Sequence, residues 1–238
     1  MCYLLYYIRT MKRVFSIILL GAICLLAACN SHKATDKVLA EVWHSDQSIR
    51  IQMAELMKAV VTEGRTDLID SLISVGDEMQ RRDSVNISIV ADILQSGVPK
   101  GLTKESYKTI WIVIDHSSID KQVQYLPLVE QMAIEKLIEK DDFAVFFDRV
   151  ALGQNRPQRY GSQTVQFGTP EDMQLYVWPV ENPATLDSLR ESVGLSPLDD
   201  YLDLLTTTTG IEPKFIPTLT IEELNEMRGR VGDAEQPE

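Results

Sequence analysis

Apolar residues recur at intervals of three and four through most of this chain, which is the spacing of one face of an α-helix. Glycine, alone or with proline, interrupts the pattern at Gly64, Gly97-Val98-Pro99 and Gly153, where helices are expected to stop. The fold is therefore mainly helical. The pattern predicts helices over Lys37–Val61, Asp67–Gln95, Lys104–Ser117, Lys121–Glu139, Phe143–Leu152, Pro183–Val193 and Pro197–Leu205.

Two short segments in the C-terminal half alternate as β-strands do. Thr164–Phe167 and Gln174–Val177 are separated by Gly168-Thr169-Pro170, which predicts a β-hairpin. Thr206 to Thr209 is expected to be a polar loop. We therefore expect an α+β fold, with one globular domain over residues 37–228 and a disordered tail over 229–238.

The N-terminus has the pattern of a bacterial lipoprotein signal peptide. Arg9, Lys12 and Arg13 precede an apolar run, Val14–Ala28, which is shorter than a spanning helix and ends in small residues before Cys29. The pattern predicts a signal peptide over residues 1–28, of which 1–10 are a start-site artefact if Met11 is the true start. Acyl chains such as palmitate would be carried by Cys29, and residues 29–36 would form a tether. A short anchor that remains attached is the alternative.

Charge and cysteine content restrict the function classes. Loss of Arg9, Lys12 and Arg13 with the leader changes the net charge from −12 to −15. A surface this acidic argues against nucleic-acid binding, and lipid rather than surface charge would hold the protein at its membrane. All cysteines lie within the first 29 residues, so the folded domain has no thiol chemistry. Because Asn30 follows Cys29, we expect the protein to be anchored in the outer membrane of a bacterial envelope, on its periplasmic or surface face.

Charged and amide residues occupy the core-facing side of two predicted helices. Asp46 and Arg50 share a helical stripe with Trp43, Met53, Met57 and Val60, and Asp83 and Asn86 share another with Met79, Val90 and Ile93. Burying such groups is costly unless they find partners. They are therefore either a network that fixes the helix register or the wall of a polar pocket.

Three further features are candidates for a site. His116 ends the apolar stretch Ile110–Ile114 beside Asp115. Asp148-Arg149 follows five apolar residues and is predicted to be a buried or half-buried ion pair. The loop Gln158–Gln163 is dense in hydrogen-bonding side chains. No HExxH motif or paired histidine ligand is present, so neither a metal site nor a cofactor is expected. Phosphate loops, GxSxG and SxxK are absent as well.

Taken together, these residues resemble an uncharacterised bacterial family catalogued as domain of unknown function six-six-two-four, over residues 40–205. Members usually have Gln before the histidine and Asp two residues after it, where this chain has Asp115 and Ser118. The family name implies no activity. The resemblance implies candidate binding positions at Asp46, Gln47, Arg50, Asp83, Asn86, Asp148, Arg149, Gln158, Tyr160, Gln163 and Arg190.

The preferred hypothesis is a lipid-anchored envelope protein that binds a small polar molecule or peptide. Arg50 and Arg149 would hold an anionic group, and the carboxylates Asp46, Asp83 and Asp148 would orient these arginines. One alternative is a hydrolase-like enzyme with His116 as general acid or base. The other is an acidic inhibitor or immunity-type protein that binds a basic protein partner.

Overall fold

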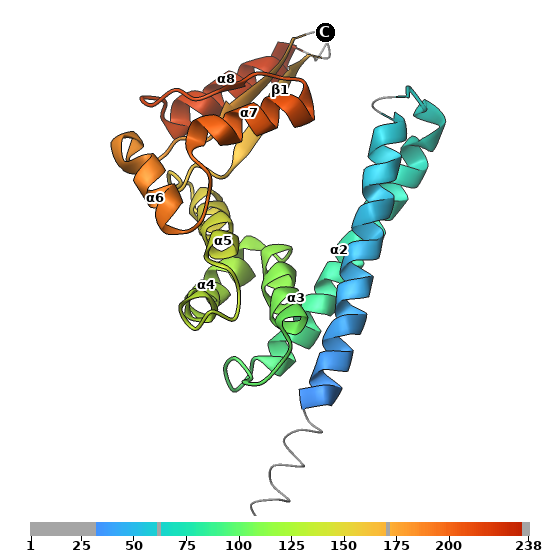
Figure 1. The fold of residues 1–238 in the computed structure, drawn as a ribbon. Coiled ribbons are helices and arrows are strands. Elements are labelled where there is room, and N and C mark those ends of the chain that lie inside the picture. Colours follow the sequence, from blue (N-terminus) through green and yellow to red (C-terminus); the bar gives the residue numbers. More distant parts are fainter. Residues whose placement is uncertain (1–31, 61–62, 170–171, 235–238) are drawn as a thin grey trace, which may run out of the picture. The chain divides into compact units, whose positions relative to one another are not determined.

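The computed structural model describes residues 32–60, 63–169 and 172–234. Its contacts divide the chain into two compact units, the first ending at Val113 and the second beginning at Ile114. The signal peptide and Cys29 lie outside the described residues. Both units are helical, and a small sheet in the second confirms the predicted α+β class (Figure 1).

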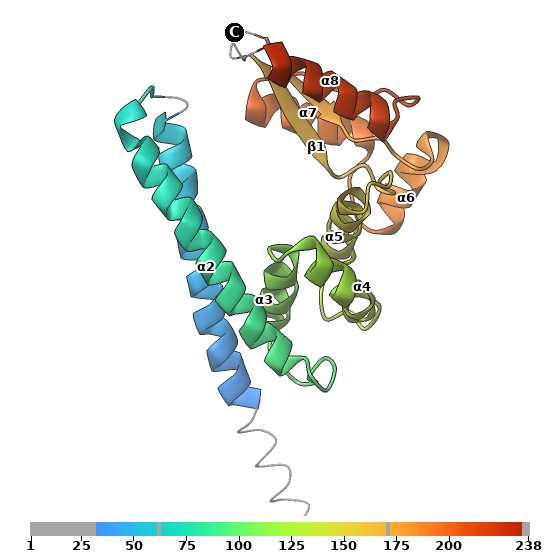
Figure 2. The ribbon, with the colours of Figure 1, turned by 180° about the vertical axis from the view of Figure 1, so that it is seen from behind.

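The first unit is built on a helical hairpin. A helix over residues 32–60 runs beside α2 (Ile69–Ile93), which follows the short 3₁₀ helix η1 (Thr66–Leu68), and both views show the two long helices side by side (Figures 1 and 2). The hairpin is followed by α3 (Lys104–Asp115). Of the residues predicted to face the core, Asp46, Asn86 and Val90 are buried, together with Leu39, Val42 and Ile49.

The core of this unit occupies only one end of the hairpin. None of the described residues in 50–60 and 63–85 is buried, and Met57, predicted to face the core, is 46% exposed. The prediction for Met57 is wrong because two helices alone cannot enclose a side chain that lies outside their line of contact. The stripe therefore becomes a core only near Asp46 and Asn86.

The second unit begins with two packed helices, α4 (Ile119–Ile134) and α5 (Lys140–Gly153). Gly153 permits their close approach, because a Cβ at this position would lie 2.2 Å from Cδ1 of Ile119. A three-stranded sheet follows, with β1 (Thr164–Thr169) antiparallel to β2 (Asp172–Val177), which is parallel to β3 (Pro213–Lys214). The predicted pairing of the two strands is confirmed. Gly168 and Thr169, which were predicted to form the turn, extend β1 instead, and Pro170 lies outside the described residues.

Helices pack around this sheet. The 3₁₀ helix η2 (Pro183–Thr185) leads into α6 (Leu186–Ser192), which contacts α7 (Leu198–Thr209). Helix α7 also contacts β3, and α8 (Ile221–Ala234) packs against β1. The sheet and these helices enclose Leu175, Val177, Leu186 and Leu224 as a second core.

Three segments that were predicted to be irregular are helical. Residues 32–36 of the predicted tether belong to the first helix, and residues 229–234 of the predicted tail belong to α8. Thr206–Thr209 completes α7, and the hydroxyls of Thr206, Thr207 and Thr209 donate to carbonyls one turn earlier. The helix ends instead at Gly210, which adopts a left-handed φ of 72°.

Candidate functional site

The predicted site residues form two clusters in different units. The first unit contains the Asp46 cluster, which consists of Asp46, Gln47, Arg50 and Asp83. The second contains the Asp148 cluster, which consists of Asp148, Gln158, Tyr160, Ser162, Gln163 and Arg190.

In the Asp46 cluster a single guanidinium links the two long helices. Arg50 lies 3.1 Å from Oδ1 of Asp46 on its own helix and donates to both carboxylate oxygens of Asp83 on α2, at 2.9 and 3.0 Å. Gln47 donates to the other Asp46 oxygen at 2.7 Å. Asp46 is completely buried, whereas the side chains of Arg50 and Asp83 are 22% and 17% exposed. The cluster therefore fixes the register of the hairpin by satisfying a charge inside it.

Asn86 lies one turn after Asp83 on α2 and is 2% exposed. Its Nδ2 has no hydrogen-bond partner among the described residues. An unsatisfied buried donor lowers stability by about 1–3 kcal/mol, so Asn86 is a weak point of this core.

Asp148 of α5 holds the loop that precedes the sheet. Its carboxylate accepts hydrogen bonds from the backbone N–H groups of Arg159, Tyr160 and Ser162 at 2.7, 3.0 and 3.0 Å, and from the Ser162 hydroxyl at 2.9 Å. The residue is completely buried. Burial raises the pKa of Asp148, although the hydrogen bonds from the loop oppose this shift.

Gln158 ties the same loop to the end of β2. Its amide donates to the carbonyls of Gln163 and Trp178 at 3.1 and 2.7 Å and accepts from the N–H of Gln163 at 2.8 Å. Gln158 is completely buried, and a buried amide without hydrogen bonds would lower the stability of the fold. These three bonds satisfy it.

Arg190 of α6 closes the loop from the other side. Its guanidinium donates to the carbonyls of Tyr160 at 2.7 Å and Ser196 at 2.6 Å, and it lies 5.0 Å from the ring centre of Tyr201. Burial lowers the pKa of Arg190, which is 2% exposed. The Tyr201 hydroxyl in turn donates to the carbonyl of Ser162.

These bonds assign the Asp148 cluster a structural part. Its polar groups hold the loop over residues 158–163 in place. The same loop was predicted to carry ligand-binding groups. The predicted Asp148–Arg149 ion pair is wrong, because successive helical residues point in different directions. Asp148 turns toward the loop, whereas Nε of Arg149 lies 2.8 Å from Oδ1 of Asp115.

His116 directly follows α3, next to the Asp115–Arg149 ion pair. Asp115 is 6% exposed and the Arg149 side chain 45%. Gln122 caps this end of α3 by donating to the carbonyls of Asp115 and Ser117.

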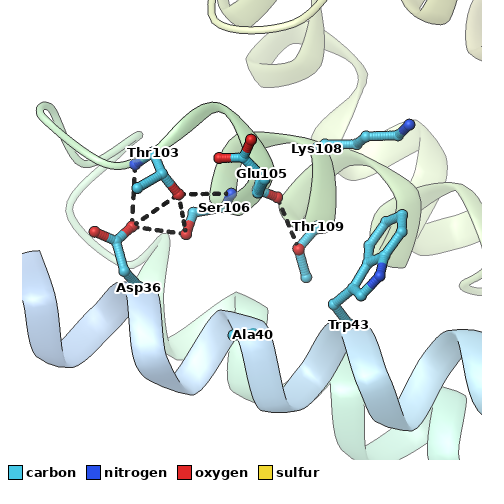
Figure 3. Close-up of a pocket in the computed structure, with 8 residues that line it drawn as sticks. All are labelled: Asp36, Ala40, Trp43, Thr103, Glu105, Ser106, Lys108 and Thr109. Carbon is cyan, nitrogen blue, oxygen red and sulfur yellow. Dashed lines mark hydrogen bonds between the residues drawn. The ribbon is translucent and has the colours of Figure 1, made fainter.

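The first unit contains a pocket of about 430 Å³ that the sequence did not predict (Figure 3). We call it the Asp36 pocket. It lies between the first helix and α3, and it is lined by Asp36, Ala40, Trp43, Thr103, Glu105, Ser106, Lys108 and Thr109. Its lining combines an aromatic ring, a cation, two carboxylates and several hydroxyls. Trp43 was singled out only as a core residue, and Asp36 was assigned to the tether.

Hydrogen bonds fix the end of the pocket where α3 begins. Thr103 caps α3 by accepting from the N–H of Ser106 at 3.2 Å. Oδ1 of Asp36 accepts from the Ser106 hydroxyl at 2.7 Å and from the N–H of Thr103 at 3.1 Å. The hydrogen bond from Ser106, helped by those from Thr103, lowers the pKa of Asp36.

The opposite wall is formed by Trp43, with Nζ of Lys108 5.7 Å from the centre of its ring. This distance is within the range of a cation–π contact. Figure 3 shows Trp43 and Asp36 rising from the first helix on either side of Ala40, with the polar side chains of α3 beyond them. The small Ala40 side chain leaves the space between them open.

A comparison with known families identifies the chain as a member of one of them. The model of the family of unknown function DUF6624 matches residues 34–214. The chain belongs to this family. In this DUF6624 protein the match includes the first helix from residue 34, and therefore every residue that lines the Asp36 pocket. No curated protein and no solved structure matches the chain.

The described part of the DUF6624 protein contains no group of three or more side chains suited to hold a metal ion. Among its helices none has the length and apolarity needed to cross a membrane.

Acid is expected to weaken the contact between the first helix and α3. Because the pKa of Asp36 is lowered in the folded protein, its contribution to stability is present above its ordinary pKa of 3.8 and is lost as the pH falls below this value. Asp36→Asn should therefore make the free energy of unfolding less dependent on pH below about 4. Urea denaturation of both proteins at a series of pH values measures this, and parallel curves would contradict it.

Proposed function

We propose that this protein is a lipid-anchored protein of a bacterial cell envelope that binds a small polar molecule in the Asp36 pocket. The observation that carries the proposal is the pocket itself, whose volume of about 430 Å³ falls within the range of small-molecule sites. Trp43 offers an apolar surface, and Lys108 and Glu105 offer opposite charges for orientation. The basic leader, the apolar run and Cys29 support the envelope location.

This proposal changes the residues expected to bind the ligand. Arg50, Asp148 and Arg190 are engaged by other groups of the protein, so a ligand would have to displace bonds that hold the fold. Lys108 and Glu105 are exposed, and they can meet a ligand without such a loss. The pocket is therefore the better candidate.

A thermal-shift screen of the purified protein in detergent tests the proposal. The probes would be amino acids, amino sugars, sugars, cell-wall fragments and soluble lipid headgroups. A ligand at a hundredfold its dissociation constant stabilises the native state by about 2.7 kcal/mol, which gives a clear rise in melting temperature. We expect at least one probe to produce this rise, and Trp43→Ala to abolish it.

Arg156→Ala is the control, because it removes an exposed arginine of the second unit that does not line the pocket. The ligand's stabilisation should persist in this variant. No rise with any probe, or a rise that survives Trp43→Ala, would overturn the proposal.

A further inference from the structure

The start of the first helix limits how far the Asp36 pocket can lie from the proposed lipid. The helix is formed by residue 32, three residues after Cys29. Three extended residues span at most about 11 Å, and the helical rise to Trp43 adds about 17 Å. The Cα atoms of Asp36 and Trp43 are thus within about 28 Å of the Cα of Cys29, whichever way the helix points. If Cys29 is acylated, this distance allows the pocket to reach the membrane surface.

The charges of the pocket select among the molecules found at such a surface. Its lining carries the carboxylates Asp36 and Glu105 and the ammonium of Lys108, for a formal charge of −1. A purely anionic ligand would meet net repulsion, whereas a ligand with an ammonium and a phosphate could face both signs. The acidic surface of the whole protein likewise disfavours anionic lipids.

The aromatic wall of the pocket, Trp43, is suited to a position at the membrane surface. Tryptophan is favoured at the level of lipid headgroups, because its ring is apolar and its N–H is polar. The ring face of Trp43 also attracts cations, as its contact with Lys108 shows. A primary ammonium supplies three N–H donors for the carboxylates and hydroxyls of the lining, and a quaternary ammonium supplies none.

From this combination we infer that the Asp36 pocket binds the headgroup of a zwitterionic phospholipid with a primary ammonium, in the membrane that anchors the protein. The ammonium faces Glu105 and Asp36, and the phosphate faces Lys108. The inference rests on the proposed function, since it names the ligand class of the same pocket and uses the same anchor.

Binding is tested with soluble glycerophosphoethanolamine, with glycerol phosphate and inorganic phosphate as the comparison probes. We expect calorimetry to show binding of glycerophosphoethanolamine alone, and Glu105→Gln and Lys108→Gln each to weaken it at least tenfold. Lys104→Gln is the matched control, because Lys104 is exposed on the same helix but does not line the pocket. Absence of binding, equal binding of glycerol phosphate, or full affinity in Glu105→Gln would overturn the inference.

The membrane as the source of the headgroup is tested with the full-length lipidated protein in phosphatidylethanolamine vesicles that carry a nitroxide label on some headgroups. Subtracting the fluorescence of the Trp43→Phe variant from that of the unsubstituted protein gives the emission of the Trp43 indole alone. We expect strong quenching of this difference signal, and its absence would overturn the membrane assignment.

The two proposals fail in distinguishable ways. If another small molecule binds in a Trp43-dependent manner and glycerophosphoethanolamine does not, the headgroup inference is wrong and the proposed binding function stands. If no probe binds, both are wrong.

Discussion

Asp148→Ala is expected to lower the free energy of unfolding by about 4 kcal/mol, because it leaves several buried donors without an acceptor. The N–H groups of Arg159, Tyr160 and Ser162 all donate to this one carboxylate. Urea denaturation measures the loss. Hydrogen exchange would locate it, since the amides of residues 159–162 should exchange faster while those of the first unit remain protected.

Two further variants separate the effect of the acceptor from that of charge. Asp148→Asn keeps one carbonyl oxygen for Arg159 and Tyr160 but directs an amide toward Ser162, so an intermediate loss is expected. Asp203→Ala removes an exposed carboxylate of α7 and should change stability by less than about 0.5 kcal/mol. If Asp148→Ala were as stable as Asp203→Ala, the structural assignment of the Asp148 cluster would be wrong.

Arg50→Met should destabilise the first unit by about 3–5 kcal/mol, because it leaves the buried Asp46 carboxylate without its cation. The double variant Asp46→Leu with Arg50→Met removes both charges of that pair but still leaves Asp83 without its arginine. Since a hydrophobic pair often replaces a buried ion pair without loss, and the Asp83 carboxylate keeps some contact with water, we expect part of the stability to return. Thermal or urea denaturation of the single and double variants measures the difference.

This result also separates the two hypotheses that the sequence left open for Arg50. A ligand-binding arginine could be replaced with little loss of stability, whereas a register-fixing arginine could not. Arg65→Ala is the control, because it removes an exposed ion pair with Asp67 and is expected to leave the unfolding midpoint unchanged. A stable Arg50→Met variant would contradict the structural assignment of the Asp46 cluster.

Much of the fold followed from local patterns in the sequence. The period of three and four predicted the long helices, and the alternation in Thr164–Phe167 and Gln174–Val177 predicted the hairpin. The same periodicity correctly placed Asp46 and Asn86 on buried faces. These features were predictable because a helix or hairpin directs its side chains by spacing alone.

Segment ends were less predictable, because residues distant in the sequence contribute to them. Residues 32–36 read as a polar tether, yet Asp36 is bound by Thr103 and Ser106, far along the chain. Thr206–Thr209 read as a loop, yet its hydroxyls bond back to α7. Residues 229–234 read as a tail but continue α8, and β3 was not predicted at all.

The sequence by itself determined which helices form, except for α8, which was not predicted. It also determined which polar residues enter the buried faces of those helices, and that the chain resembles the family to which it belongs. Only the tertiary structure decided what those polar residues do. Asp148 could have faced Arg149 or a ligand, and it faces the backbone of a loop eleven to fourteen residues later. The Asp36 pocket likewise combines side chains from two helices far apart in the chain. Spacing specifies direction around one helix, but partners across the fold are set by how the helices pack.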